Sequence, residues 1–301
     1  MRNTLPINFT RRPVRGLVCT LAALMLAGSA CAQSIAFTFD DGPDMADRIG
    51  MTAAERNAAI LRQLAEAKLK SIQFVTRTDT DERRFELIRD WGQEGHGVAN
   101  HTATHPDFDS STVSLNGFEQ DVLKCDAAIR SLPGYTKLFR FPYLKEGNTL
   151  EKRDGFRLFL TSIDYRPAPV SVDISDWYYN ERLRERLKKS PTTDRTLYRD
   201  AYLQHLYSRA VYYDGLSKAV LGRSILHVTL LHHKLINALF LADAVQMFRD
   251  MGWHVIDATT AFDDPVYSIG PDILPAGESI LWALAKQHGM TGLRWPGEDD
   301  S

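Results

Sequence analysis

Two adjacent aspartates, Asp40 and Asp41, stand in the segment 38–43 (TFDDGP), directly after an apolar run. Asp-Gly-Pro is common in turns, so the segment alone predicts a turn more often than a site. The carboxylates, however, end an expected strand, where successive side chains point in different directions. One carboxylate can therefore bind a metal ion while the other transfers a proton.

A second candidate group is His101 and His105, which lie four positions apart. The spacing predicts two imidazoles on one side of a helical turn, able to share one cation. Thr102 and Ala103 between them do not fit the zinc-protease motif, which requires a glutamate. Two histidines alone could also be unrelated surface residues. With one aspartate they would form a two-histidine, one-carboxylate face that leaves positions for water and substrate.

Three more polar segments follow expected strands. They are RFPY at 140–143, DISDW at 173–177 and LLHH at 230–233. Each segment also has an interpretation without function. Residues 140–143 could be an ordinary strand end, residues 173–177 a helix cap beside a packed tryptophan, and the histidines of 230–233 structural residues. The carboxyl ends of barrel strands lie on one rim, so we expect all five groups to meet there.

Alternating strands and helices would position these groups. The expected strands are 35–39, 71–76, 97–100, 137–141, 170–174, 224–231 and 254–256. The expected helices are 52–68, 81–91, 115–132, 150–154 and 236–251. About seven such units in roughly 230 residues predict an α/β fold with a mainly parallel sheet, and favour a (β/α) barrel.

The barrel is expected to form a single catalytic domain at residues 33–262, because no linker interrupts it. Residues 179–222 are charged and rich in tyrosine with helical periodicity, which predicts a helical insertion interrupted near 190–191. Residues 263–301 are expected to be a C-terminal extension that packs on the barrel; the stretch 278–287 within it is amphipathic.

The first 32 residues have the three parts of a secretory signal peptide. Four arginines precede the apolar stretch 16–28, and Ala30-Cys31-Ala32 after it provides an A-x-A cleavage site. Thirteen apolar residues are too few to span a bilayer. We therefore expect export to the periplasm or the medium. A twin-arginine route and a lipoprotein anchored through Cys31 are minor alternatives.

The 301 residues are 44% hydrophobic and 25% charged, with a formal net charge of −2. This composition excludes collagen-like, disordered and coiled-coil chains, and the absence of long apolar runs excludes a multispan membrane protein. Cleavage after Ala32 would remove four arginines and leave a charge of −6, which disfavours nucleic-acid and anionic-lipid partners. Cys125, the one cysteine left, lies on an apolar helical stripe and is expected to be a core thiol.

Taken in order, the five segments resemble the motifs of the NodB-like polysaccharide deacetylases, carbohydrate esterase family 4. The motifs read Thr-Phe-Asp-Asp-Gly, His-Thr-x-x-His, Arg-x-Pro-Tyr, Asp-x-x-Asp-Trp and Leu-x-His, and the resemblance covers about residues 35–257. It implies a distorted (β/α) barrel and a divalent metal, most often zinc, with cobalt, nickel or manganese as other choices. It also implies hydrolysis of N-acetyl groups in an N-acetylglucosamine polymer: chitin, peptidoglycan or poly-N-acetylglucosamine.

Other functions remain open at this point. One is an O-acetyl xylan esterase of the same family, and another is an inactive carbohydrate-binding relative. A third is an iron-dependent oxygenase with the same facial ligands, although its usual His-x-Asp spacing is absent. For partners, we expect a polysaccharide or oligosaccharide substrate and a monomeric protein.

The resemblance assigns the metal ligands by position to Asp41, His101 and His105. Asp40 would be the catalytic base, and Arg140 would orient it. These five residues come from the first three motifs.

The later motifs would supply the general acid, His232, with its pKa tuned by Asp173. Two assignments stay open: His233 stands where the family usually has aspartate, and Asp176 could share or replace the role of Asp173. Tyr143 would offer a backbone N–H to the oxyanion, and Leu230 and Trp177 would wall the acetyl pocket. The substrate-facing residues are then Pro142, Tyr143, Asp176, Trp177 and Leu230.

Overall fold

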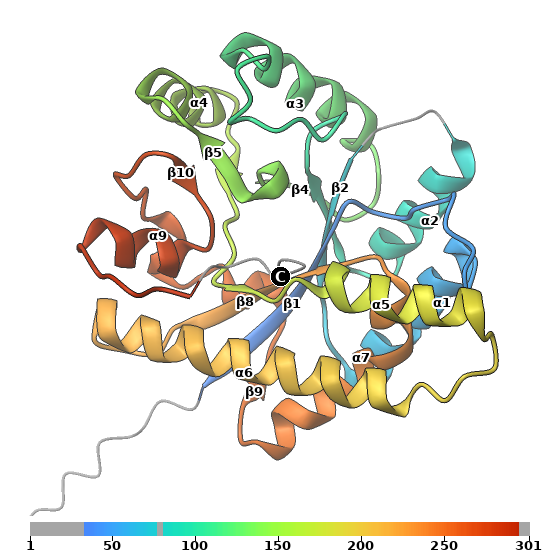
Figure 1. The fold of residues 1–301 in the computed structure, drawn as a ribbon. Helices are drawn as coiled ribbons and strands as arrows, with labels where there is room; N and C mark the ends of the chain where they lie inside the picture. Colours follow the sequence, from blue (N-terminus) through green and yellow to red (C-terminus); the bar gives the residue numbers. More distant parts are fainter. Residues whose placement is uncertain (1–32, 77–80, 295–301) are drawn as a thin grey trace, which may run out of the picture. The chain divides into compact units, whose positions relative to one another are not determined.

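A curled parallel sheet forms the centre of the fold (Figure 1). The computed structural model describes residues 33–76 and 81–294, so the predicted signal peptide lies outside the described residues. Within them the main sheet has the order β6-β4-β3-β2-β1-β8-β7, and β9 also pairs with β1. Its strands are β1 (Ser34–Asp40), β2 (Ile72–Val75), β3 (Gly97–Asn100), β4 (Tyr135–Phe139), β6 (Arg166–Pro167), β7 (Val172–Asp173), β8 (Leu226–His232) and β9 (His254–Val255).

All ladders of this sheet are parallel, as the alternation of strands and helices predicts. The two-residue strands β6 and β7 are its edges in the described part of the chain, so the barrel is open between them. This architecture is the predicted distorted (β/α) barrel.

The two longest strands, β1 and β8, pair along their whole length. Their register runs from Ser34 opposite Leu226 to Asp40 opposite His232. Every residue of β1 is buried, which is typical of a strand covered on both faces. Because the carboxyl ends of the two strands are level, Asp40 lies beside His232 despite their distance along the chain.

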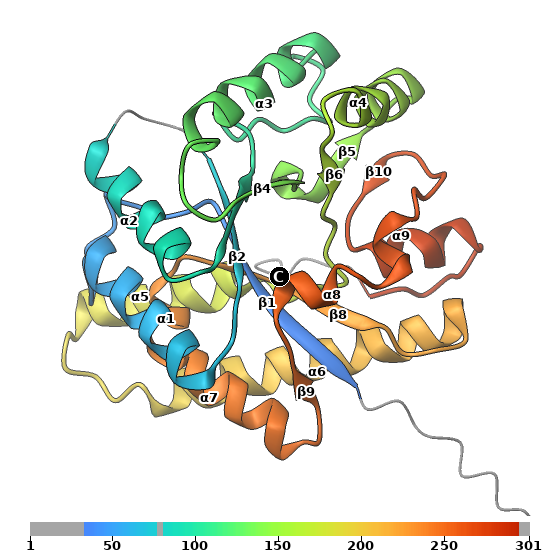
Figure 2. The same ribbon diagram turned by 180° about the vertical axis from the view of Figure 1, so that it is seen from behind.

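Helices surround the strands in both views (Figure 1 and Figure 2). They are α1 (Ala53–Ala67), α2 (Glu82–Gln93), α3 (Leu115–Ile129), α4 (Leu150–Ser162), α5 (Asp176–Lys189), α6 (Thr196–Leu221), α7 (Leu235–Asp250), α8 (Ala258–Ala261) and α9 (Ile280–Gln287). Helix α1 shows why such segments are helical: Thr52 and Glu55 form a reciprocal capping box at its start, and Ile60 and Leu64 bury its inner face.

Helix α4 is longer than the sequence pattern predicts, since it continues past Gly155 to Ser162. A Cβ on Gly155 would lie 2.5 Å from a methyl carbon of Leu115, so the glycine permits close packing of α4 on α3. Phe156 and Leu160 then bury themselves in a second core of mostly aromatic residues, beside the main core between sheet and helices. Tertiary packing outweighs the low helix propensity of glycine here.

The predicted insertion and extension both contribute to the main core. Residues 179–222 form most of α5 and all of α6, and α6 buries Leu206 and Tyr213. In the extension, Leu281 of α9 is fully buried in the same core. Strand β10 (Ala276–Gly277) pairs with β5 (Lys145–Gly147), so the extension also contacts the loop after β4.

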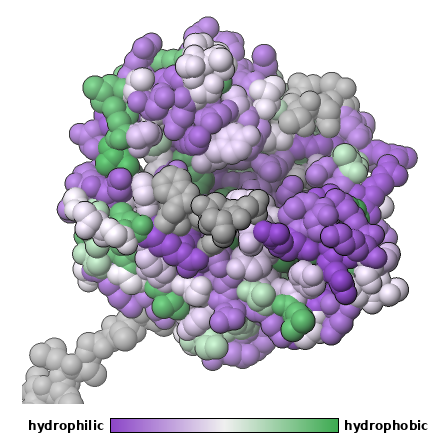
Figure 3. All heavy atoms as spheres, in the orientation of Figure 1, coloured by the Kyte–Doolittle hydropathy of each residue, from purple (hydrophilic) through white to green (hydrophobic). Residues whose placement is uncertain are grey.

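Each helix of the described chain is too short or too polar to cross a bilayer. On the face drawn in Figure 3, hydrophilic residues predominate and hydrophobic residues form small separate patches. Cys125 is a buried free thiol with a raised pKa caused by burial, which agrees with a packing role.

Candidate active site

Asp40 and Asp41 diverge because the backbone turns sharply at the end of β1. Asp41 has φ 69° and Gly42 has φ 80°, both in the left-handed region. The Asp41 carbonyl is held in place by N–H donors from Thr76 and Arg84, at 3.3 and 2.6 Å. The two carboxylates consequently face different partners, as expected from their position after a strand.

The histidine pair is not on a helical turn, contrary to the sequence prediction. Residues 101–105 form a loop in which Thr102 and His105 have φ values of 68° and 55°. Asn100 accepts a hydrogen bond from Thr102 N–H, and Asp121 Oδ2 accepts two from backbone N–H groups of the loop, at 3.0 and 2.8 Å. Hydrogen bonds to these buried acceptors stabilise the loop in place of a helical turn, and the loop still directs both imidazoles to one point.

Asp41, His101 and His105 lie close together although the histidines are in a loop. Asp41 Oδ1 lies 3.3 Å from His105 Nε2 and 3.6 Å from His101 Nε2. His101 Nδ1 is 2.8 Å from the Arg140 carbonyl, to which it donates, so its Nε2 presents a lone pair. Burial also lowers the pKa of His101, which favours the neutral imidazole that binds metals.

The residues present fit a divalent metal ion. The three ligand atoms lie within 4.8 Å of one another. Asp41 Oδ1 is buried, and in the described part of the chain it has no hydrogen-bond partner. A buried carboxylate oxygen without a donor is costly unless a cation neutralises it. One carboxylate and two imidazoles are a donor set typical of zinc and other first-row divalent metals.

Asp40 is fixed by Arg140. Arg140 Nη1 donates to Asp40 Oδ1 at 2.6 Å and to Thr38 Oγ1 at 2.8 Å, while the guanidinium packs 3.9 Å from the centre of the Phe74 ring. The other oxygen, Asp40 Oδ2, lies 3.8 Å from His101 Nε2. Asp40 therefore keeps one oxygen free beside the three candidate ligands.

His232 is paired with Asp176, not with Asp173, which the sequence analysis favoured. His232 Nδ1 lies 2.6 Å from Asp176 Oδ1, and His232 N–H donates to Asp176 Oδ2 at 2.8 Å. Asn237 donates to the same oxygen at 2.5 Å. Burial alone would lower the pKa of His232, but the charge and hydrogen bond of Asp176 outweigh it and raise the pKa to about 9.

The adjacent His233 points elsewhere. It is buried, and its Nε2 lies 3.1 Å from Asn57 Oδ1. Burial and the nearby charge of Arg56 lower its pKa to about 3, so it stays neutral. The geometry therefore selects His232 from the two histidines that the sequence left open.

A cavity of about 540 Å³ joins these groups. The predicted site residues that line it are Asp40, Asp41, His101, His105, Tyr143, Asp173, Trp177, Leu230 and His232. Pro142 is buried at the start of a short 3₁₀ turn, and the Tyr143 ring is 58% exposed and packs 4.5 Å from the His105 ring. Arg140, Pro142 and Asp176 support the cavity from behind its lining.

Four lining residues escaped the sequence analysis: Leu144, Lys145, Lys234 and Glu278. Leu144 and Lys145 directly follow the third motif, and Lys234 directly follows the fifth, so extension of the motifs would have found them. Glu278 had no such signal, because the extension brings it to the site from far along the chain. Burial and the charge of Asp173 raise the pKa of Glu278 to about 7. Burial raises the pKa of Asp173 to about 6.

Comparisons with known proteins agree with the motifs. Residues 27–157 match the polysaccharide deacetylase family. The peptidoglycan-N-acetylglucosamine deacetylase of Bacillus cereus is 28% identical over 156 residues, which are 52% of this chain and 50% of that protein. The chitooligosaccharide deacetylase of Sinorhizobium fredii is 36% identical over 99 residues, which are 33% of this chain and 40% of that protein. The chain thus spans half or less of the length of these two curated relatives.

Among solved structures, the catalytic domain of a peptidoglycan N-acetylglucosamine deacetylase from Eubacterium rectale has the same fold. It superposes with a TM-score of 0.53 at 20% identity, over 76% of this chain and 90% of that domain. These matches confirm the predicted resemblance to NodB-like deacetylases and the predicted fold.

Proposed function

We propose that this chain, a relative of the NodB-like polysaccharide deacetylases, is a metal-dependent hydrolase of N-acetyl groups in an N-acetylglucosamine polymer. One observation carries the proposal: Asp41, His101 and His105 converge on a single point, and Asp40 and His232 flank it in one cavity. Hydrolysis of an amide needs this combination of an electrophilic centre, a base and an acid.

Asp41, His101 and His105 would hold the metal. A divalent ion bound there supplies Lewis-acid chemistry, because it polarises the acetyl carbonyl and makes a nearby water easier to deprotonate. Zinc suits the donor set; cobalt, nickel and manganese are also compatible with it. The buried Asp41 oxygen without a hydrogen-bond donor supports this assignment.

Asp40 is proposed as the general base. Arg140 occupies Oδ1, so Oδ2 is the oxygen that takes the proton of the attacking water. Because Arg140 is itself held by Thr38 and by the Ala168 carbonyl, the base cannot rotate away from the water. A positioned base of this kind contributes about 10²–10⁴-fold to a rate.

His232 is proposed as the general acid. An amine leaves poorly unless it is protonated, and the raised pKa of His232 keeps a proton available at neutral pH. Asp176 provides that shift and fixes the ring through Nδ1, so Nε2 is the atom that donates to the leaving nitrogen.

The acetyl group would lie between these groups. The Tyr143 backbone N–H is proposed to stabilise the oxyanion, and its left-handed φ of 55° sets the direction of the peptide there. Leu230 and the half-exposed Trp177 line the cavity and provide its apolar wall, while Pro142 fixes the turn that carries Tyr143.

Export, the polymer and the oligomeric state belong to the same proposal. The sequence pattern of residues 1–32 supports export to the periplasm or medium, where such polymers occur. The named relatives act on peptidoglycan and on chitooligosaccharide, which supports an N-acetylglucosamine polymer as substrate. We propose a monomer that binds this polymer.

Acetate release tests the proposal. The purified protein, loaded with zinc, is incubated with N-acetylglucosamine oligomers and, in parallel, with O-acetylated xylan oligomers. We expect acetate from the first set, loss of release on chelation, and recovery with zinc. Stoichiometric zinc without acetate from either set would show an inactive carbohydrate-binding protein. Release from xylan alone would show an O-acetyl esterase.

A further inference from the structure

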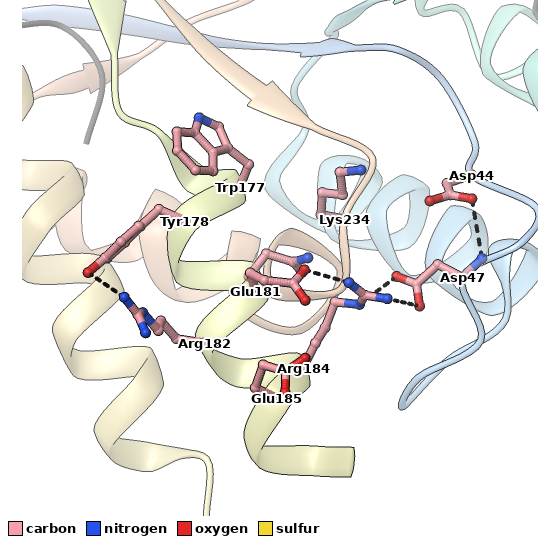
Figure 4. Close-up of a pocket in the computed structure, with 10 residues that line it drawn as sticks. Asp44, Asp47, Trp177, Tyr178, Glu181, Arg182, Arg184, Glu185 and Lys234 are labelled. Atoms are coloured by element: carbon pink, nitrogen blue, oxygen red, sulfur yellow. Dashed lines mark hydrogen bonds and ion pairs between the residues drawn. The ribbon is translucent and has the colours of Figure 1, made fainter. Parts of the chain in front are cut away.

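A second cavity adjoins the candidate active site. It encloses about 300 Å³ and is lined by α5 and by residues of the 44–47 loop (Figure 4). Trp177 and Lys234 line both this cavity and the larger one that contains the candidate metal ligands. The two cavities therefore meet at these two side chains, and one elongated ligand could occupy both.

Most charged groups of the second cavity are already engaged. Arg184 contacts Asp47 at 3.1 Å and Glu181 at 2.5 Å. Glu185 pairs with Lys188 at 2.5 Å, outside the cavity lining. Arg184 and Lys188 thus neutralise part of the negative charge in the cavity wall.

Asp44 and Arg182 are engaged as well. Asp44 accepts a hydrogen bond from Asp47 N–H at 3.2 Å, and Arg182 donates to the Tyr178 hydroxyl at 3.2 Å (Figure 4). Both side chains thus have structural contacts that hold them in the wall.

Lys234 is different. It is half-buried, and it lines a third cavity beside Asp41 in addition to the other two. Its ammonium group has no hydrogen bond or ion pair to any other residue that the structure describes, and Figure 4 shows it between Trp177 and Asp44 with no marked contact. A cation placed where three cavities meet is available to an anionic ligand.

The position of Lys234 in the fold is unfavourable for stability. It is the N-cap residue of α7, and its side chain caps no backbone N–H. Serine, threonine, aspartate and asparagine are preferred at N-caps, and a positive charge there opposes the helix dipole. A lysine that costs helix stability at the junction of two cavities is more readily explained by ligand binding.

We propose that Lys234 binds a carboxylate on the sugar next to the acetylated one, so that the substrate is an acidic amino-sugar polymer. This inference rests on the proposed deacetylase function. Trp177, which is 45% exposed, lies between the two cavities and offers a face for the sugar ring. Lys145, the other lysine that lines the catalytic cavity, is paired with Asp107 at 2.8 Å, so the carboxylate is assigned to Lys234.

The test compares two substrates that differ by one charge. They are an oligomer of N-acetylglucosamine and N-acetylmuramic acid, which carries a lactyl carboxylate, and its methyl ester. We expect wild-type kcat/KM to be about tenfold higher for the acid, as for a partly exposed charge-assisted contact. Lys234→Met removes the preference, Lys234→Arg retains it, and added salt reduces it.

Lys189→Met is the matched control, because it removes a lysine charge from the exposed end of α5, outside both cavities. It is expected to keep the preference. Equal kcat/KM for acid and ester in the wild type, or an undiminished preference in Lys234→Met, would overturn the inference. An oligomer with a short peptide on the lactyl group distinguishes a peptide carboxylate from the lactyl carboxylate as the bound group.

Calorimetric binding of acid and ester separates this inference from the proposed function. Tighter binding of the acid that depends on Lys234, without acetate release, supports the inference and contradicts the deacetylase proposal. Acetate release with equal binding of both oligomers supports the deacetylase proposal and contradicts the inference about Lys234.

Discussion

The two halves of the described chain contribute different parts of the candidate site. The half matched by the family, which ends at residue 157, provides Asp40 and the three candidate metal ligands. The half after it provides His232 and its partner Asp176. Of the remaining cavity wall, it also provides Asp173, Trp177, Leu230, Lys234 and Glu278, and the first half provides Tyr143, Leu144 and Lys145. The first half thus contains the groups that would activate water, and the second contains those that would meet the leaving group and the polymer.

This division suggests that hydrolytic chemistry and substrate choice can vary separately. In the first half, the site residues occupy short motifs that follow β1, β3 and β4, and β2 separates β1 from β3 in the sheet. In the second half, Asp173 and His232 also end strands, β7 and β8, but Trp177, Lys234 and Glu278 come from helix starts and from the extension. Substitutions in the first half should therefore abolish turnover, whereas those in the second should change its pH dependence or selectivity.

The largest expected effect is that of Asp40→Asn in the first half. Removal of the base should lower kcat by about 10³-fold. The three candidate ligands are unchanged, so zinc content measured by mass spectrometry should stay near that of the wild type. Asp41→Asn is the matched comparison, since it should lower both zinc content and activity. Full activity in Asp40→Asn would remove the proposed base.

The next largest effect is that of Asp176→Asn in the second half, which should change the pH dependence of kcat. In the wild type, His232 has a pKa raised to about 9, so the acid form is lost, and activity falls, as pH rises through that value. Without the carboxylate, only the charges of Asp41 and Asp40 oppose the burial penalty, so the pKa of His232 should fall toward its ordinary value of about 6.5. The alkaline limb of kcat should therefore shift downward, by up to about two pH units.

Asp173→Asn is the control for this shift. Asp173 has no hydrogen bond to His232 in the structure, so this substitution should shift the alkaline limb of kcat less. The same raised pKa has a consequence for folding: its contribution to stability is complete below about pH 6.5 and is lost as pH rises through about 9. Thermal unfolding of Asp176→Asn against pH would show whether the variant has lost this dependence. An unchanged alkaline limb would remove Asp176 from the mechanism.

Glu278→Gln should have the smallest effect. Glu278 has a pKa raised to about 7, so the wild-type cavity gains a negative charge as pH rises through neutrality. The glutamine variant cannot gain it, so KM should depend less on pH between about 6 and 8, with changes of at most about fivefold. Steady-state kinetics across this range provides the measurement. A loss of kcat comparable to that of Asp40→Asn would place Glu278 in the chemistry itself.

Sequence reasoning succeeded where one element determines the outcome. The segment before Asp40 is an apolar run, which predicts a buried strand, and the strand is buried. Parallel strands place their carboxyl ends on one rim, so the position of Asp40 on that rim could also be predicted. Local reasoning failed for the His101–His105 segment, where spacing suggested a helical turn. The loop is determined by Asp121, which binds its N–H groups from a neighbouring helix.

The sequence alone determined which residue types could do chemistry and that they follow strands: Asp40, Asp41, His101, His105 and His232. Only the tertiary structure decided that Asp176 pairs with His232, that His233 is buried beside Asn57, and that Glu278 reaches the cavity. The physical reason is that sequence patterns report only on residues close together along the chain. Periodicity and strand position describe directions within one element, whereas contacts between elements depend on register, curvature and packing that no local pattern encodes.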